Sequence, residues 1–332
     1  MPAAHAIHMI AYGPPDVLVY GPAALAQLAA GEVRIRTIAA AVNHTDLKIR
    51  AGAWPVRRAN PFPYVPGVEV VGTITQTGSA VKDWAVGQTV ITMMQGLGGV
   101  RADRPGGYAE FVTADSNALA LVPPAVDALS MAALGLVGVT ALGGLSRLGS
   151  LEGKRVLVTG AAGGVGSAAI AIARAMGASV AGIVARAEQT QHVTGLGADQ
   201  VIVVERGQLP QLAPASVDAV LDSVGGPLFG PCVSALRDHG SLVLVGAVAG
   251  AEVSFDAWQL IRPVTLTGYS TETLDGAGLR AAVERLSAWL ETGTIRAPEY
   301  RTIPLERAAH AHHLLEQGGV NGRVLLIPNA AG

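Results

Sequence analysis

A glycine-rich turn between an apolar strand and a small-residue helix constrains the fold of this chain more than any other segment. Residues 155–166 read Arg-Val-Leu-Val-Thr-Gly-Ala-Ala-Gly-Gly-Val-Gly. In such a turn Gly163 lets the backbone approach a pyrophosphate, Gly166 permits close packing of helix on strand, and the helix N-terminus presents free N–H groups to the anion. Ala161 stands where the usual G-x-G-x-x-G pattern has its first glycine. The segment predicts a dinucleotide-binding loop, and the alternative is an ordinary tight turn.

The residues around this turn alternate between short apolar strands and segments of helical length. Six strands are expected at residues 155–159, 179–184, 200–204, 217–221, 241–245 and 264–268, with helices such as 164–176 and 187–196 between them. This alternation predicts a doubly wound parallel sheet of order 3-2-1-4-5-6, with helices on both faces. A second glycine cluster, residues 222–226, ends the fourth strand. We expect both glycine loops to line one crevice, where the order of the strands reverses.

The N-terminal third has a different texture. Short β-type runs at 33–37, 68–74 and 88–92 are separated by Gly and Pro, which is typical of a compact all-β domain. The Pro123-Pro124 pair cannot continue a helix or a central strand and marks the first boundary. Beyond the sixth strand we expect helices at 277–291 and 305–317 and a closing strand at 323–327.

Composition excludes several classes of protein. The net charge is −2 and no long basic run occurs, so nucleic-acid binding is not expected. Two uncharged stretches, 128–146 and 156–173, have lengths near that of a membrane span, but glycines interrupt both, and a buried α/β core is the better interpretation. The first residues lack a basic region ahead of an apolar one, so no signal peptide and a cytoplasmic location are expected. A single cysteine, Cys232, excludes an intrachain disulfide and any multi-cysteine zinc site.

The end of the second strand indicates which dinucleotide is bound. Enzymes that use NAD typically place Asp or Glu roughly 20 residues beyond the glycine loop, to bind the ribose 2′-hydroxyl. Here Arg186 occupies that place and the first carboxylate is Glu188. A guanidinium suits a 2′-phosphate, so NADPH is the predicted cofactor. The alternatives are that Arg186 is a solvated surface charge and that Glu188 reaches the ribose.

Five motifs together resemble a known family. They are Val-Pro-Gly-Val-Glu-Val-Val-Gly at 65–72, Gly-Gly-Tyr-Ala-Glu-Phe-Val at 106–112, the loop at 160–166, the cluster at 222–226 and Asn-Gly-Arg-Val-Leu-Leu-Ile-Pro at 321–328. The chain resembles the zinc-free quinone oxidoreductases of the medium-chain dehydrogenase/reductase superfamily, relatives of zeta-crystallin. The resemblance implies an α/β protein with a GroES-like β domain at 1–124 and 269–332 and a Rossmann domain at 125–268. It also implies a homodimer that pairs through the edge of the Rossmann sheet.

The resemblance also bears on metal binding. Zinc-dependent relatives carry a cysteine ligand where this chain has Asn43, and a histidine ligand where it has Val68. Both ligands are lost, so no metal is expected. Without a Lewis acid to stabilise an alkoxide, alcohol oxidation is disfavoured, whereas hydride transfer to a quinone or to the β-carbon of an enone stays accessible.

The family's site residues carry over to this chain by position. The resemblance implies that Asn43 and Thr140 lie near the nicotinamide and that Ser223, Gly246 and Ala247 bracket that half of the cofactor. Gly163, Gly164 and Val165 would hold the pyrophosphate, Arg186 the 2′-phosphate, and Arg323 would close on the cofactor from the C-terminus.

Two further residues are candidates for the proton donor. Lys48 stands where many quinone reductases carry a tyrosine, and it would polarise a carbonyl or donate a proton. Its alternative is a surface lysine on a helical turn. Tyr269 follows the sixth strand and would act as a proton donor or as a packing residue at the domain hinge.

The predicted activity is an NADPH-dependent, zinc-independent reduction of a quinone or an α,β-unsaturated carbonyl compound. The alternatives are a polyketide-pathway enoyl-thioester reductase or another dehydrogenase, and a non-catalytic NADPH-binding protein. The segments 52–64 and 93–105 shape the cleft and carry no chemical signature, so all these acceptor classes stay open. His310, His312 and His313 with Glu316 look like a metal cluster, but no second ligand group is near in sequence, and metal binding is not expected there.

Overall fold

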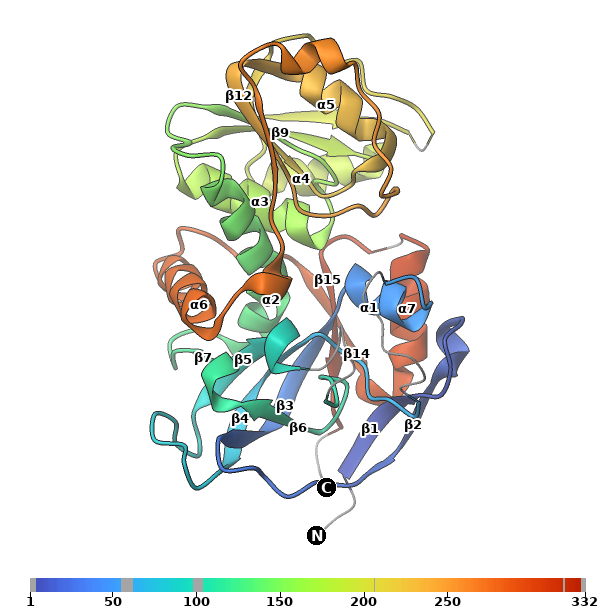
Figure 1. Ribbon diagram of the computed structural model, residues 1–332, viewed down its shortest axis with the longest axis vertical. Coiled ribbons are helices and arrows are strands. Elements are labelled where there is room, and N and C mark those ends of the chain that lie inside the picture. Colours follow the sequence, from blue (N-terminus) through green and yellow to red (C-terminus); the bar gives the residue numbers. More distant parts are fainter. Residues whose placement is uncertain (1–3, 55–61, 98–103, 206, 319, 330–332) are drawn as a thin grey trace. The chain divides into compact units, whose positions relative to one another are not determined.

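The computed structural model describes residues 4–54, 62–97, 104–205, 207–318 and 320–329 (Figure 1). The chain divides into two compact units. Unit 1 comprises Met1–Leu136, Glu272–Glu291 and Glu299–Gly332, and unit 2 comprises Val137–Thr271 and Thr292–Pro298. The division after residue 136 falls within a helix, whereas the boundary expected from sequence precedes that helix, at 124. Parts of the segments 52–64 and 93–105 lie outside the described residues.

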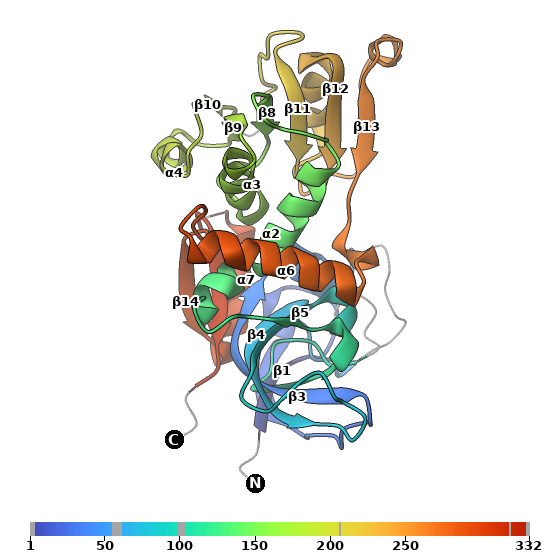
Figure 2. The same ribbon diagram turned by 90° about the vertical axis from the view of Figure 1, so that its left-hand side faces the viewer.

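Unit 2 contains the doubly wound sheet that the sequence predicts. All six strands are parallel and lie in the order β10-β9-β8-β11-β12-β13, which is the order 3-2-1-4-5-6 (Figure 2). Their bounds are β8 Arg155–Val158, β9 Ser179–Val184, β10 Gln200–Val203, β11 Val217–Asp222, β12 Leu236–Leu244 and β13 Thr265–Gly268. β12 begins at Leu236 rather than at the expected 241, and its register against β11 shifts between Val217 and Ala219.

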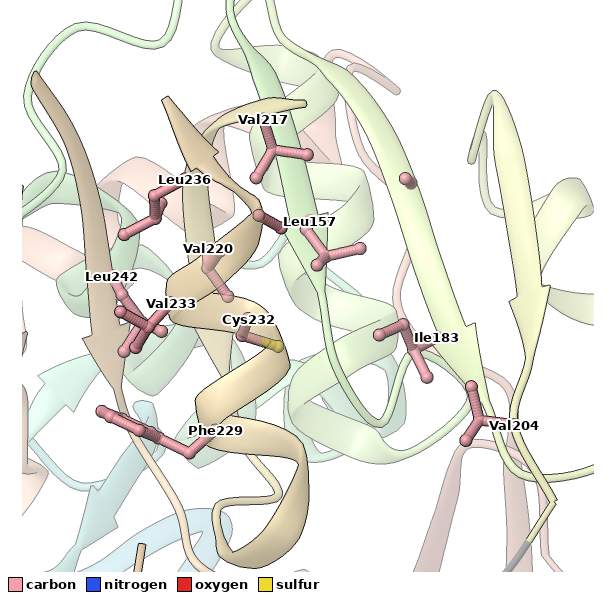
Figure 3. Close-up of a cluster of buried hydrophobic side chains, with 12 residues drawn as sticks. Leu157, Ile183, Val204, Val217, Val220, Phe229, Cys232, Val233, Leu236 and Leu242 are labelled. Atoms are coloured by element: carbon pink, nitrogen blue, oxygen red, sulfur yellow. The ribbon is translucent and has the colours of Figure 1, made fainter. Parts of the chain in front are cut away.

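Helices α3 (Gly164–Ala175), α4 (Thr190–Gly195) and α5 (Phe229–Ala235) pack on this sheet. α5 covers apolar side chains of the strands, including Leu157, Val220 and Leu242 (Figure 3). Cys232 of α5 is fully buried in this cluster, and burial raises the pKa of its thiol. The cysteine is therefore an apolar core residue.

Helix α2 (Ala128–Ser146) occupies the first of the two uncharged stretches. It is the one helix in the described part of the chain that is long and apolar enough to cross a membrane, and 72% of its most apolar stretch is buried inside the protein. Glycines on α2 allow close approach of other groups: a Cβ at Gly135 would lie 2.2 Å from a carboxylate oxygen of Glu69, and one at Gly144 would lie 2.8 Å from Val245. These contacts are those of a core helix.

Unit 1 contains the β domain. β1 (Ala4–Met9) and β2 (Leu18–Ala23) form an antiparallel pair, and the larger sheet has the order β14-β15-β3-β4-β5-β7, with β6 also paired to β3. The bounds are β3 Glu32–Val42, β4 Glu69–Thr77, β5 Thr89–Met93, β6 Phe111–Asp115, β7 Ala120–Leu121, β14 Tyr300–Pro304 and β15 Arg323–Ile327. β15 pairs antiparallel with β3, so the C-terminal segment completes the β domain, as the family resemblance implies.

The helices of unit 1 are α1 (His44–Arg50), α6 (Gly276–Glu291) and α7 (Ala308–Glu316). α6 packs on β7, and α7 packs beside β14 and β15. Short 3-10 turns complete the two units: η1 Pro15–Val17, η2 Met94–Gly96, η3 Ser116–Ala118, η4 Ala187–Gln189, η5 Gly226–Leu228, η6 Ala257–Leu260, η7 Thr271–Thr273 and η8 Leu305–Arg307.

Candidate functional site

The turn between β8 and α3 in unit 2 presents backbone rather than side chains. Gly160 adopts a left-handed conformation with a φ of 60°, and a Cβ at Gly166 would lie 2.2 Å from the carbonyl oxygen of Gly160. Gly163 is exposed, and Gly164 and Val165 are partly exposed at the first turn of α3. The N-terminus of α3 therefore offers accessible N–H groups, and this cradle fits a pyrophosphate.

A set of buried hydrogen bonds, made by Thr159, Asp222 and Ser223, connects this turn to the second glycine loop. The Thr159 hydroxyl donates to Oδ1 of Asp222 at 2.5 Å and accepts from the N–H of Ser223 at 3.0 Å. The Ser223 hydroxyl donates back to the carbonyl oxygen of Thr159 at 3.0 Å. Asp222 also accepts from the N–H of Gly225 at 3.1 Å. The carboxyl ends of β8 and β11 are thus locked together where the strand order reverses.

Three residues predicted to bind the cofactor, Ser223, Gly246 and Ala247, lie together beside these hydrogen bonds. A Cβ at Gly160 would lie 2.9 Å from the Ser223 hydroxyl, and one at Gly246 would lie 2.8 Å from the carbonyl oxygen of Ser223. Gly225 has a φ of 64° and lies against Ala247, where a Cβ would come within 3.2 Å. Ser223, Gly246 and Ala247 therefore belong to one glycine-lined surface.

The other predicted residues of unit 2 occupy different surroundings. Arg186 is exposed after the end of β9, and its backbone N–H donates to the Gln189 side chain at 3.2 Å. Thr140 lies on α2 and is 8% exposed. The Tyr269 ring lies against Gly143, with the Arg147 guanidinium 5.6 Å from the ring centroid. Burial raises the pKa of Tyr269 and Arg147 opposes that rise. This packing favours a structural role for Tyr269.

In unit 1, Asn43 stands between the end of β3 and the start of α1. Its side-chain nitrogen lies 3.2 Å from the carbonyl oxygen of Ala41 and 3.2 Å from Oε2 of Glu69. Both partners only accept hydrogen bonds, so this atom must be the amide nitrogen. Asn43 is 5% exposed, and its side chain also accepts from the backbone N–H of Asp46 in the capping box of α1, so its carbonyl oxygen has one further lone pair for a ligand.

Glu69 is the centre of a buried cluster. Its side chain is fully buried, and its Oε2 accepts from the Arg323 guanidinium at 3.0 Å. Its Oε1 accepts from the N–H of Leu136 in α2 at 2.5 Å. Burial raises the pKa of Glu69, and Arg323, the Leu136 N–H and the Asn43 amide oppose that rise. Arg323, predicted to contact the cofactor, is 5% exposed and is engaged in this ion pair.

The sequence predicts no zinc at these residues. The resemblance puts zinc ligands at the two positions that carry Asn43 and Val68 in this chain. The guanidinium of Arg323 also places a positive charge beside the Glu69 carboxylate. Within residues 4–329, apart from the gaps already given, no group of three or more His, Cys, Asp or Glu side chains could hold a metal ion.

Helix α1 presents two basic side chains of unit 1. Lys48 is partly exposed and follows His44 by one helical turn, so both lie on the same side of the helix. Desolvation, Arg323 and Lys48 all lower the pKa of His44, although part of the imidazole keeps contact with solvent. His44 was not among the residues predicted from the sequence, and its spacing of four residues from Lys48 is the signal that could have identified it.

The three histidines of α7 do not converge. His310 and His313 are exposed, whereas His312 is fully buried and faces Tyr108.

Two protein families match the chain: the alcohol dehydrogenase GroES-like domain at residues 29–124, and the zinc-binding dehydrogenases at residues 196–326. The chain is 30% identical to an NADPH-dependent alkenal/one oxidoreductase of Arabidopsis thaliana, over 96% of this chain and 78% of the relative. It is 28% identical to an acryloyl-coenzyme A reductase of Metallosphaera sedula, over 90% of this chain and 92% of the relative. A solved structure of an Escherichia coli quinone oxidoreductase complexed with NADPH is 26% identical and superimposes with a TM-score of 0.85, covering 98% of this chain and 100% of the other.

Proposed function

This chain belongs to the medium-chain dehydrogenase/reductase superfamily, and on that premise we propose that it is a zinc-independent, NADPH-dependent reductase of quinones or α,β-unsaturated carbonyl compounds. The observation that carries the proposal is that Asn43 and Val68 stand where the resemblance puts the two zinc ligands, and that the Asn43 amide is bound to the Glu69 carboxylate, which pairs with Arg323. The relatives named for alkenal/one and quinone reduction support the acceptor class, and the NADPH in the E. coli structure supports the cofactor.

In this proposal the residues of unit 2 bind the cofactor, and the residues of unit 1 act on the acceptor. When bound, NADPH would supply a hydride for an already electrophilic carbon of a conjugated acceptor, and one proton would complete the reduction. In unit 2 the backbone N–H groups at the start of α3 would hold the pyrophosphate, and Arg186 would hold the 2′-phosphate. In unit 1 the carbonyl oxygen of Asn43 accepts a hydrogen bond from the ligand, and Lys48 polarises the acceptor's carbonyl oxygen and donates the proton.

The proposal is tested by the oxidation of NADPH with three acceptors: 9,10-phenanthrenequinone, 2-cyclohexenone and a crotonyl thioester. We expect turnover with the quinone or the enone, unchanged by EDTA and not raised by added Zn²⁺. Turnover with the thioester alone would favour the enoyl-thioester alternative, which the acryloyl-coenzyme A reductase relative supports. Tight NADPH binding without turnover of any acceptor would favour a binding protein instead.

Replacing Lys48 tests the proposed proton donor. We expect Lys48→Ala to lower kcat by at least about 100-fold, the usual contribution of a positioned general acid. Lys154→Ala, a change to a lysine of unit 2 before β8, is the matched control and should leave kcat unchanged. Equal kcat and KM in Lys48→Ala and wild type would assign Lys48 to the surface alternative.

Replacing Arg186 tests the cofactor preference. We expect Arg186→Ala to raise the Kd for NADPH about 10-fold or more and to leave that for NADH unchanged, because only NADPH carries the 2′-phosphate. Arg174→Ala is the control, since Arg174 is also exposed in unit 2 but pairs with Asp199 at 3.1 Å. Titration of cofactor fluorescence gives both constants. Equal losses for the two cofactors would contradict this assignment.

The chain is also proposed to form a homodimer through the edge of the parallel sheet. β13 is one of the two edge strands, and the 258–261 region before it carries Trp258 at 74% and Ile261 at 71% exposure. Large exposed apolar side chains beside an open strand favour association. Sedimentation velocity should give twice the chain mass of 33.7 kDa, and Ile261→Asp should give the monomer. Val86→Asp in unit 1, where Val86 is 64% exposed, should leave the dimer intact.

A further inference from the structure

A buried chain of hydrogen bonds connects α7 with α1 inside unit 1. The Arg50 guanidinium donates to the carboxylate of Glu316 and, at 3.4 Å, to Nδ1 of His312. The other ring nitrogen of His312, Nε2, lies 3.1 Å from the Tyr108 hydroxyl. Arg50, Tyr108 and His312 are each at most 3% exposed.

The chemistry of the partners fixes the direction of this chain. A guanidinium only donates, so Nδ1 of His312 accepts and Nε2 carries the hydrogen. Nε2–H therefore donates to the Tyr108 oxygen, and the Tyr108 hydroxyl donates to Asp46, with which it is hydrogen-bonded. Burial, followed by Arg50, lowers the pKa of His312 to about 3, which agrees with a neutral ring.

Asp46 is the last group in this series of hydrogen bonds, and its side chain is fully buried. Its Oδ2 accepts from the N–H of Asn43 at 2.8 Å, and its Oδ1 accepts from the N–H of Val68 at 3.0 Å. Asn43 begins α1, and Val68 precedes Glu69, which holds the Asn43 amide. One carboxylate thus fixes the backbone on both sides of the Asn43 side chain.

This series of hydrogen bonds does not conduct protons. A guanidinium does not release its proton in a protein, so Arg50 interrupts any path that starts at Glu316. Its effect is electrostatic and positional. Burial raises the pKa of Asp46 to about 7, and the nearby Glu69 carboxylate adds to that rise. The N–H groups of Asn43 and Val68 and the Tyr108 hydroxyl oppose it by binding the ionised form.

We propose that Asp46 is a positioning residue whose ionised carboxylate, held by Tyr108 and through it by His312 and Arg50, fixes the start of α1 and presents Asn43 for the reaction. The charged and titratable groups that face Asp46 are the Glu69 carboxylate of β4 and the Tyr108 hydroxyl. Protonation of Asp46 weakens its hydrogen bonds with the N–H groups of Asn43 and Val68. Turnover therefore falls on the acid side of the Asp46 titration, and this consequence rests on the proposed reductase function.

The test is Tyr108→Phe, which keeps the ring and removes the hydroxyl. A hydrogen bond to a charged group contributes about 1.5–3 kcal/mol, so we expect the acid limb of the kcat–pH profile to move up by about one pH unit or more. The KM for NADPH should not change, because the nucleotide loops belong to unit 2. Tyr20→Phe is the matched control, since the Tyr20 hydroxyl donates to Glu110 at 3.3 Å, a carboxylate that also accepts from the N–H of His5 in β1. It should leave the profile in place.

A second measurement separates this inference from the proposed function. Deuterium uptake over residues 43–50 reports the start of α1 without any turnover, and we expect faster uptake in Tyr108→Phe than in Tyr20→Phe. If the wild type reduces no acceptor, faster uptake in Tyr108→Phe still supports the positioning role while the reductase proposal fails. If Tyr108→Phe does not fold, His312→Gln, which keeps one donor and one acceptor, takes its place and should shift both readouts in the same direction. A pH profile and an uptake equal to those of the control would overturn the inference.

Discussion

Arg323→Ala is expected to lower the free energy of unfolding by about 3–5 kcal/mol, because it leaves the fully buried Glu69 carboxylate without its counter-charge. Urea unfolding followed by circular dichroism measures the loss. The Asn43 amide and the Leu136 N–H remain bonded to Glu69, but neutral donors do not replace a guanidinium in a region closed to water. We also expect acceptor turnover to fall, since Glu69 orients Asn43.

The matched control is Arg237→Ala. Arg237 also makes a 3.0 Å ion pair, with Asp218, but its side chain is 49% exposed, and pairs of this kind contribute about 0–1 kcal/mol. The double variant Glu69→Gln, Arg323→Met should recover part of the stability lost in Arg323→Ala, because it removes both charges together. A loss in Arg323→Ala no larger than that in Arg237→Ala would contradict the buried ion pair.

The second large effect is a pair of opposite pH dependences within unit 1. Asp46 has a pKa raised from 3.8 to about 7, so the folded state binds the extra proton between these values. Its contribution to stability is complete below pH 4 and is lost as the pH rises through 7. His312 has a pKa lowered from 6.5 to about 3, so its contribution is complete above pH 6.5 and is lost as the pH falls toward 3.

The pH ranges over which Asp46 and His312 change stability overlap, and the two effects have opposite signs. Each group therefore hides the pH dependence of the other in the wild-type protein. We expect the stability of Asp46→Asn, relative to wild type, to rise by roughly 4 kcal/mol between pH 4 and pH 7. His312→Gln should show the opposite slope, with its relative stability falling over the same range. Unfolding free energies at four or five pH values measure both slopes. Parallel curves for wild type and both variants would show that neither group changes its pKa on folding.

The sequence was sufficient for most of unit 2, for a physical reason. A parallel sheet buries both faces of each strand, so every strand is a short apolar run, and glycine turns and helical segments separate these runs. The strand order followed from the resulting topology. α2 was not predicted as a helix, because a helix that is apolar on nearly all sides has no amphipathic period to detect.

The polar cluster of unit 1 was harder to predict because its partners are far apart in sequence. The motifs around Glu69 and Arg323 were both recognised, but their contact depends on the placement of β15 beside β3. The resemblance assigned Arg323 to the cofactor, and the ion pair with Glu69 emerged only from the structure. Likewise, the histidines of α7 formed a cluster only in the sequence: His310, His312 and His313 point in different directions, and the buried one completes a hydrogen-bond chain.

The pairing of β15 with β3 also has a consequence for how the protein is made. Arg323 is synthesised 254 residues after Glu69, and all of unit 2 lies between them in the chain. Unit 2 can fold during translation, since domains generally fold as units. The β domain must wait with Glu69 unneutralised until β15 has left the ribosome. The cluster of Asn43, Glu69 and Arg323 can therefore assemble only after unit 2 and β15 have been synthesised.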